Sequence, residues 1–266
     1  MTRLDSGRLT AELAVRVAPN PGPMTLDGTN TWIVGDPQRT PPVVVDPGPL
    51  LAEHLAAVLG DCGGRIATIL LTHRHLDHAE GAATLAATAG CGVRAADPAW
   101  CVGSDGLREG DVLFTGTARL EVVATPGHTT DSVSLLLVDE DGEARLLTGD
   151  TVLGRGTTVI TYPDGDLGRY LASLDRLERL VEERGVPTIL PGHGPLVTDP
   201  LERLRAYRAH RLARLEEVRQ ALAAGVDTPA GIVARVYADV DRSVWPAAEQ
   251  SVRAQLDYLA GGPTSD

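Results

Sequence analysis

The chain has 266 residues, 43% of them hydrophobic, and its formal net charge at pH 7 is −12. This length and composition are typical of a globular protein with one large domain, or with a domain and a small appendage. The acidic balance disfavours sequence-independent binding to a nucleic-acid backbone, and no apolar run reaches the roughly 20 residues of a membrane span. The charged N-terminus does not resemble a signal peptide and the three cysteines form no C-x-x-C pair, so a reducing, cytoplasmic location is expected.

The first 200 residues alternate between short apolar runs, mostly β-branched, and helical patterns. We expect strands at residues 13–17, 31–34, 43–46, 68–72, 120–124, 133–138, 145–148 and 188–190. We expect helices at residues 50–59, 78–89 and 167–183, the last with a clear amphipathic stripe. This mixture predicts sheets covered by helices.

The composition changes after Pro200, where a long helix rich in arginine and leucine is expected at residues 201–224. Two further helical patterns follow at residues 228–238 and 246–259, each opened by a proline at its first turn. We therefore predict two domains, a main one at residues 1–200 and a small helical one at residues 201–266.

Four potential metal ligands are concentrated in the run His73-x-His75-x-Asp77-His78. Alternate residues of an extended segment point the same way, so His73 and His75 can converge on one ion. Asp77 and His78 lie where the chain turns into a helix and can reach a second ion. Packing alone gives no reason to place three imidazoles and a carboxylate within six residues.

Three more candidates, His128, Asp150 and His193, each end an apolar run and enter a turn marked by glycine or proline. Strands that end in this way can deliver their side chains to one shared rim. Imidazole suits zinc and iron, and a carboxylate can bridge two cations. The full set predicts a two-metal site with a bridging hydroxide, most simply with two Zn²⁺ ions, although Mn²⁺ or Fe would also fit.

The order of these residues resembles that of the metallo-β-lactamase superfamily of hydrolases, over about residues 10–200. The resemblance implies an αββα sandwich with the metals at one edge of the sheets. It implies a first metal position at His73, His75 and His128, a second at Asp77, His78 and His193, and a bridging Asp150, with Asp77 and Asp150 as the catalytic carboxylates. Asp46 matches the family's early aspartate that supports the metal loop, although it could also be a plain turn residue.

Residues 20–31 and 149–158 resemble the LACTB2-like branch of that superfamily, and so does the C-terminal tail with its pair His210-Arg211. This branch carries a winged-helix-like C-terminal domain. It includes endoribonucleases that prefer single strands and thioester hydrolases of polyketide pathways. The resemblance therefore predicts the fold and the metals better than the substrate.

Other polar residues offer weaker hypotheses. Asn30, Thr157, Thr158 and His210 could contact substrate, but turn, strand-end or surface-helix roles explain them more simply. His54 falls on the helix expected at residues 50–59, and we expect it to be exposed.

The sequence thus predicts a binuclear metal-dependent hydrolase that acts on single-stranded RNA or on an acyl thioester. A glyoxalase-II-like glutathione thioesterase is one alternative, and a metal-stabilised nucleic-acid-binding module is another of a different class. A β-lactam substrate is not expected, because no export signal is recognised. The C-terminal helices could form a lid over the site or the interface of a homodimer.

Overall fold

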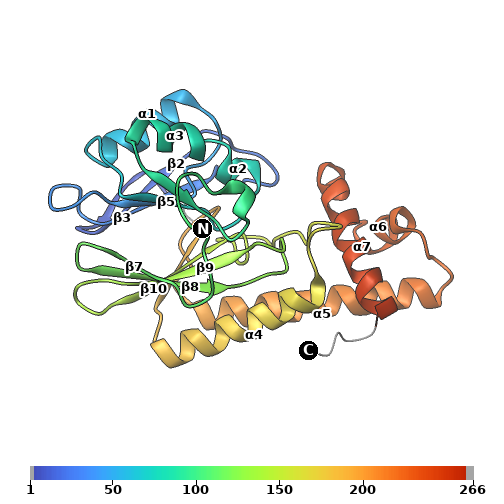
Figure 1. Ribbon diagram of the computed structural model, residues 1–266. Coiled ribbons are helices and arrows are strands. Elements are labelled where there is room, and N and C mark those ends of the chain that lie inside the picture. The colour runs from blue at the N-terminus through green and yellow to red at the C-terminus, as the bar shows by residue number, and fades with distance from the viewer. Residues whose placement is uncertain (1–2, 262–266) are drawn as a thin grey trace.

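The computed structural model describes residues 3–261, and in it two β-sheets lie face to face between two layers of helices (Figure 1). Helices α1 (Ala52–Asp61) and α3 (Ala82–Ala89) cover the outer face of one sheet. Helices α4 (Leu167–Arg184) and α5 (Pro200–Ala223) lie along the outer face of the other. This is the αββα sandwich that the sequence predicted.

The first sheet has the strand order β1-β2-β3-β4-β5-β6. Its strands are antiparallel from β1 to β4 and parallel from β4 to β6. Their bounds are β1 (Gly7–Thr10), β2 (Leu13–Val17), β3 (Asn30–Val34), β4 (Val43–Val45), β5 (Thr68–Leu70) and β6 (Gly92–Arg94).

The second sheet has the strand order β11-β10-β9-β8-β7, in which only β10 and β11 pair in parallel. Its strands are β7 (Val112–Thr115), β8 (Ala118–Ala124), β9 (Val133–Val138), β10 (Ala144–Gly149) and β11 (Thr188–Pro191). Each of the eight strands predicted from the sequence is present, with ends that differ by two residues or fewer.

The central strands are apolar on both faces because both faces are buried. In β9, Leu135 and Leu137 pack between the sheets, whereas Leu136 points outward against the layer of α4 and α5. Ala14 of β2 likewise faces the layer of α1 and α3, while its neighbours Leu13 and Val15 face the other sheet. Successive side chains of a strand point to opposite faces, so a strand between two layers reads as a continuous apolar run.

The three strands not predicted from the sequence, β1, β6 and β7, are short and include the outer strand of each sheet. In β7, Phe114 is 71% exposed, because the outer face of this edge strand meets solvent. An edge strand with a solvated face lacks the apolar pattern by which the other strands were recognised.

The single helix predicted at residues 78–89 is wrong. The chain forms a short helix α2 (Leu76–Ala79) and then α3, with a break at Glu80 and Gly81. The backbone amide of Gly81 donates to the carbonyl of Gly48, and a Cβ at this position would lie 3.0 Å from that same oxygen. The loop that carries Gly48 therefore approaches too closely for one continuous helix.

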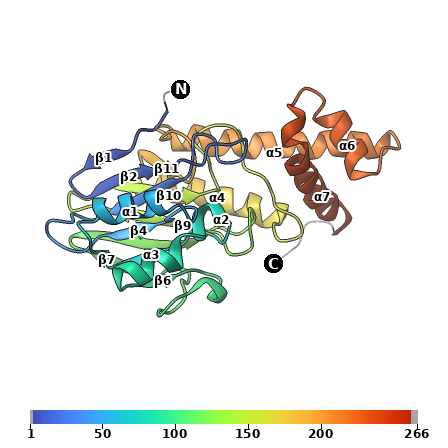
Figure 2. The ribbon, with the colours of Figure 1, turned by 90° about the horizontal axis from the view of Figure 1, so that it is seen from above.

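The C-terminal helices α6 (Pro229–Val236) and α7 (Trp245–Gly261) form a compact unit with the distal half of α5 (Figure 2). The 3₁₀ turns η1 (Pro98–Trp100) and η2 (Arg242–Val244) complete the described elements. Helix α5 packs against α4 with one part of its length and against α6 and α7 with another, so it joins the two units. The domain boundary at residue 200 stays a prediction. Within residues 3–261, no helix combines the length and apolar composition that crossing a membrane requires.

Candidate metal centre

The structure brings all seven predicted ligands together at one edge of the sandwich. They come from segments that follow four strands and from α2: His73 and His75 after β5, Asp77 and His78 in α2, His128 after β8, Asp150 after β10 and His193 after β11. Each strand is fixed between two buried layers, so its last residues reach the rim with little freedom.

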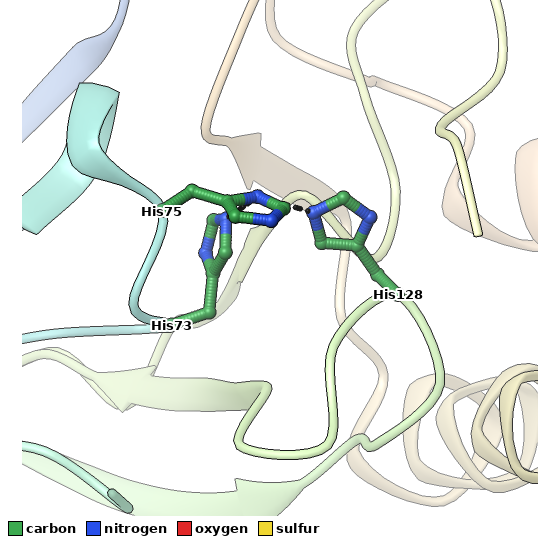
Figure 3. A group of neighbouring side chains, drawn as sticks. All are labelled: His73, His75 and His128. Atoms are coloured by element: carbon green, nitrogen blue, oxygen red, sulfur yellow. Dashed lines mark hydrogen bonds between the residues drawn. The ribbon is translucent and has the colours of Figure 1, made fainter. Parts of the chain in front are cut away.

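A first group of nitrogens is formed by His73, His75 and His128 (Figure 3). His75 Nδ1 lies 3.1 Å from His73 Nε2 and 3.1 Å from His128 Nε2. The rings meet edge to face, with interplanar angles of 79° and 84° at His75. Three imidazole nitrogens therefore converge on one point.

A second group is formed by Asp77, His78 and His193. His78 Nε2 and His193 Nε2 are 3.1 Å apart, and Asp77 Oδ2 lies 3.1 Å from His193 Nε2. Both imidazoles are completely buried, whereas the Asp77 side chain is 29% exposed. Asp77 is thus the member of this group that solvent can reach.

Asp150 stands between the two groups. Its Oδ1 lies 3.3 Å from His78 Nε2 and 3.4 Å from His193 Nε2, and its Oδ2 lies 3.8 Å from His128 Nε2. Asp150 Oδ1 is buried and has no hydrogen-bond partner among residues 3–261. One carboxylate oxygen therefore faces the second group and the other faces the first, as a bridging ligand requires.

The outer nitrogens of the imidazoles are held by fixed acceptors. Nδ1 of His78 donates to Asp46 Oδ2 at 2.9 Å, and Nδ1 of His193 donates to the carbonyl of Gly28 at 3.1 Å. Nδ1 of His128 donates to the carbonyl of Val159 at 2.6 Å. Such bonds set the tautomer of each neutral ring, so that its Nε2 is the atom available to a metal.

Asp46 has the supporting position that the sequence suggested. Its carboxylate accepts the backbone amide of Thr72 at 2.8 Å and the Thr72 hydroxyl at 2.6 Å, in addition to His78. Its backbone is in the left-handed region, with φ 52°, which a residue with a Cβ seldom adopts. The structure around Asp46 stabilises this strained conformation, which aims one carboxylate at two segments of the site.

The pKa shifts of the histidines differ between the first and the second group. Burial lowers the pKa of His128 to about 4, although Asp150 opposes this shift. Burial alone would also lower the pKa of His193, but the nearby carboxylates of Asp150 and Asp77 raise it to about 9. The pKa of His78 is raised well above its usual value, because Asp150, Asp77 and Asp46 together outweigh its burial. Without metal, protons therefore remain on the second group.

These residues fit a pair of divalent cations. Four-coordinate zinc with nitrogen ligands at 2.0–2.1 Å requires ligand atoms about 3.3 Å apart, which is close to the 3.1 Å spacing in both groups. Nitrogens that face each other at this distance cannot all be hydrogen-bonded, and Asp150 Oδ1 has no partner in the described chain. Cations would satisfy each of these atoms. The role of the seven residues as ligands stays a prediction.

A cavity of about 670 Å³ opens onto the cluster at Asp77, His128 and Asp150. One wall comes from the C-terminal unit and has an apolar part formed by Tyr237, Val240, Val244, Pro246, Ala247 and Ala248, while Arg214, Ser243, Gln250 and Ser251 of the same unit also line the cavity. The cavity is also lined by Pro23, Met24 and Leu26. A cavity of this size is typical of sites for small molecules.

Three of the four predicted substrate contacts line the cavity, and the fourth has a structural role. Thr157, Thr158 and His210 line the cavity, and burial together with Arg211 and Arg214 lowers the pKa of His210 to about 4. Asn30 is 1% exposed, and its amide donates to the carbonyls of Pro191 and Gly194 at 3.0 and 2.9 Å. The Asn30 side chain therefore holds the loop of His193 rather than facing the cavity.

His54 is not exposed, contrary to our expectation from the sequence. It is 3% exposed, and its Nε2 lies 3.1 Å from both the Pro47 carbonyl and the Thr31 hydroxyl. It packs beneath the loop that follows Asp46. The helical pattern did not reveal this, because the covering loop comes from outside the helix.

Sequence reasoning also missed Thr72 and Val159, which hold Asp46 and His128. Thr72 could have been suspected from its place between β5 and His73. The carbonyl of Val159 could not, because every residue has a backbone carbonyl and the sequence carries no signal for its use.

Comparison with known proteins shows the family to which the chain belongs. A model of the metallo-beta-lactamase superfamily matches residues 24–193, and a model of the beta-lactamase associated winged helix domain matches residues 228–260. The chain is 33% identical over 276 residues to the beta-lactamase-like protein 2 homolog of Drosophila melanogaster, covering 95% of this chain and 89% of that protein. It is 31% identical to the atrochrysone carboxyl ACP thioesterase of Aspergillus chevalieri, covering 82% and 68% respectively.

A crystal structure of a metallo-beta-lactamase family protein from Thermus thermophilus has the same fold. Its TM-score is 0.78 at 23% identity, covering 95% of this chain and 94% of that one. The two family models agree with the sandwich and with the C-terminal unit of helices. The chain belongs to the metallo-β-lactamase superfamily of metal-dependent hydrolases, within the branch of the β-lactamase-like protein 2 homologues (LACTB2-like).

Proposed function

We propose that this protein is a binuclear metal-dependent hydrolase of acyl thioesters, whose acyl group enters the cavity beside the metal centre. The observation that carries the proposal is the position of the apolar wall. It comes from the C-terminal unit, while the other end of the same cavity reaches Asp77, His128 and Asp150. An apolar group bound against this wall would have its reacting carbonyl at the cluster.

The two groups of ligands would hold one divalent cation each, with Asp150 between them. Cations bound there supply Lewis acidity, which polarises a carbonyl oxygen and lowers the pKa of water toward neutrality. The residues of the chain orient the site, because Asp46, Gly28 and Val159 hold the rings of His78, His193 and His128. Asp77, which is partly exposed, can accept a proton at its free oxygen during turnover.

Three observations support a small acyl substrate. The cavity is limited in volume, its C-terminal wall carries several aliphatic side chains, and Tyr237 is the one Phe, Tyr or Trp residue among those that line it within residues 3–261. Single-stranded nucleic acid is usually held by several aromatic stacking surfaces. A relative of this chain is named as a thioesterase acting on a carboxyl ACP, and another is named thioesterase pkgB.

Cleavage of single-stranded RNA is the second candidate, and Arg211 is the observation in its favour. Arg155 and Arg214 line the cavity but pair with Asp27 and Glu217. Arg211 also lines it, is 3% exposed, and has no carboxylate partner within residues 3–261. A buried guanidinium without a counter-ion could receive a phosphate group.

The deciding experiment is an assay of the purified metal-loaded protein against acyl thioesters of increasing chain length, S-lactoylglutathione and a single-stranded RNA oligomer. The Asp150→Ala variant should lose at least about 10³-fold of the activity, whereas Asp141→Ala, which removes an exposed carboxylate, should not. Two bound ions per chain and Asp150-dependent thioester turnover would support the proposal. RNA cleavage with the same dependence and no thioester turnover would overturn it.

A variant of the apolar wall tests the acyl group separately. Ala247→Phe would fill part of the cavity, so KM for long acyl thioesters should rise at least about fivefold while acetyl thioester turnover is kept. Ala213→Phe places the same side chain on the exposed face of α5 and serves as the control. Equal effects of Ala247→Phe on short and long substrates would show that the acyl group does not bind along this wall.

The sequence also suggested a glyoxalase-II-like thioesterase and a nucleic-acid-binding module. S-lactoylglutathione in the assay tests the glyoxalase-II-like alternative directly. The non-enzymatic nucleic-acid-binding module is not retained, because the chain belongs to a family of hydrolases. A homodimer stays a prediction.

A further inference from the structure

The orientation of His128 depends on a backbone carbonyl outside regular secondary structure. His128 Nδ1 donates to the Val159 carbonyl at 2.6 Å, so Nε2 is left for the first metal position. Val159 belongs to residues 157–162, a segment without helix or strand between β10 and α4. The position of that carbonyl therefore depends on whatever fixes this segment.

Helices α5 and α7 fix the segment on both sides of Val159. Arg211 of α5 donates through its Nη2 to the carbonyl of Thr158, the residue before Val159. The hydroxyl of Ser251 in α7 accepts the backbone amide of Ile160, the residue after it, at 3.1 Å. Both side chains are buried, with 3% and 4% exposure.

A second set of bonds ties the same segment to the loop of His128. The carbonyl of His128 accepts the backbone amide of Thr161 at 3.2 Å and the Thr161 hydroxyl at 2.6 Å. The Thr158 hydroxyl lies 3.2 Å from His128 Nδ1. The segment is thus held between the metal loop on one side and helices α5 and α7 on the other.

We propose that Arg211 and Ser251 are positioning residues for His128, so that helices α5 and α7 take part in metal binding without supplying a ligand. The proposal rests on the proposed function, since it takes His128 as a ligand of the first metal position. Buried hydrogen bonds to the residues flanking Val159 limit the movement of its carbonyl, and an acceptor that cannot move holds the imidazole in one tautomer and orientation. A C-terminal unit that acted as a lid alone would affect substrate binding and leave the affinity for metal unchanged.

The test is the affinity of each metal position for Co²⁺, measured by its absorption spectrum and by competition with a chelator. Ser251→Ala should weaken binding at the first position about tenfold, at the low end of the range for residues that support a ligand, and should leave the second position unchanged. Arg211→Met should do the same. Ser251→Thr keeps the hydroxyl and should restore wild-type affinity.

Ser243→Ala is the matched control. It makes the same chemical change in the same unit and at the same cavity, but within residues 3–261 the Ser243 side chain makes no hydrogen bond to residues 157–162. A second readout is the exchange of the His128 Nδ1 proton with solvent, measured by NMR in the Zn²⁺-loaded protein. This exchange should quicken in Ser251→Ala and stay slow in Ser243→Ala.

His128→Ala separates the failure of this proposal from that of the proposed function. If wild type binds no metal, or if His128→Ala keeps full affinity at both positions, the metal-centre assignment is wrong. If His128→Ala loses the first position while Ser251→Ala and Arg211→Met both retain it, with slow proton exchange, the positioning role is wrong and the metal centre stands. Because the two variants remove different contacts, a folding defect in one leaves the other to decide.

Discussion

Asp46 Oδ2 lies 2.9 Å from Nδ1 of His78, a residue 32 positions later in the chain. The same carboxylate accepts both the amide and the hydroxyl of Thr72, next to His73. The strained Asp46 therefore holds His78 of the second metal position and also Thr72, which precedes His73 of the first metal position. This explains why a residue that is not a ligand candidate is buried at 1% exposure with a left-handed backbone.

Asp46→Asn should weaken metal binding chiefly at the second position. The amide preserves the size of the side chain, and asparagine tolerates the left-handed backbone, but the negative charge behind His78 is lost. We expect the affinity of the second position to fall about 10- to 100-fold, with a smaller change at the first. Calorimetric titration of the metal-free protein with Zn²⁺ would resolve the two steps. An unchanged second step would show that Asp46 has only a structural role.

Gly192→Ala should disrupt the centre because glycine is required by close approach. A Cβ at residue 192 would lie 2.6 Å from Asp150 Oδ1 and 2.8 Å from His78 Cε1. We expect a loss of stability of about 1–3 kcal/mol and release of metal from the second position. Gly60→Ala is the control, because a Cβ there meets nothing within 4 Å on helix α1. It should stabilise by up to about 1 kcal/mol in urea unfolding, and equal effects of the two variants would contradict this account.

His54 should make the protein less stable in acid. Burial lowers the pKa of His54 in the folded protein, so the unfolded chain takes up a proton first as the pH falls below about 6.5. The contribution of neutral His54 is thus present above that pH and is lost below it, by at most about 1.4 kcal/mol per pH unit. Urea unfolding of wild type and His54→Gln, both saturated with Zn²⁺, should show a stability difference that shrinks from pH 8 to pH 5. A constant difference would mean that His54 does not titrate in this way.

Metal binding should release protons. In the metal-free protein the pKa of His193 is raised to about 9, so at pH 7 its ring carries a second proton that a cation must displace. Apparent affinity should therefore rise with pH and level off above about 9. Addition of Zn²⁺ in weak buffer with an indicator dye should report at least one proton per chain at pH 7 and fewer near pH 10. Equal proton release at pH 7 and near pH 10 would show that the displaced protons come from other groups.

The amino-acid sequence determined the local elements and the set of candidate ligands. Apolar runs that end at glycine, proline or aspartate predicted eight strands, and the spacing of His73, His75, Asp77 and His78 marked a candidate metal-binding run. These features could be predicted because periodicity and spacing act over a few residues. The order of His128, Asp150 and His193 added the resemblance from which the fold followed.

Only the tertiary structure decided how the centre is supported. It broke the helix expected at residues 78–89, because the loop of Gly48 approaches Gly81, and it buried His54 beneath another loop. It turned Asn30 toward the loop of His193 and placed the carbonyl of Val159, fixed from α5 and α7, behind His128. These contacts join segments far apart in the chain, often through backbone atoms that every residue shares. No pattern in the sequence marks them, and they form only when the two sheets and the C-terminal helices are packed together.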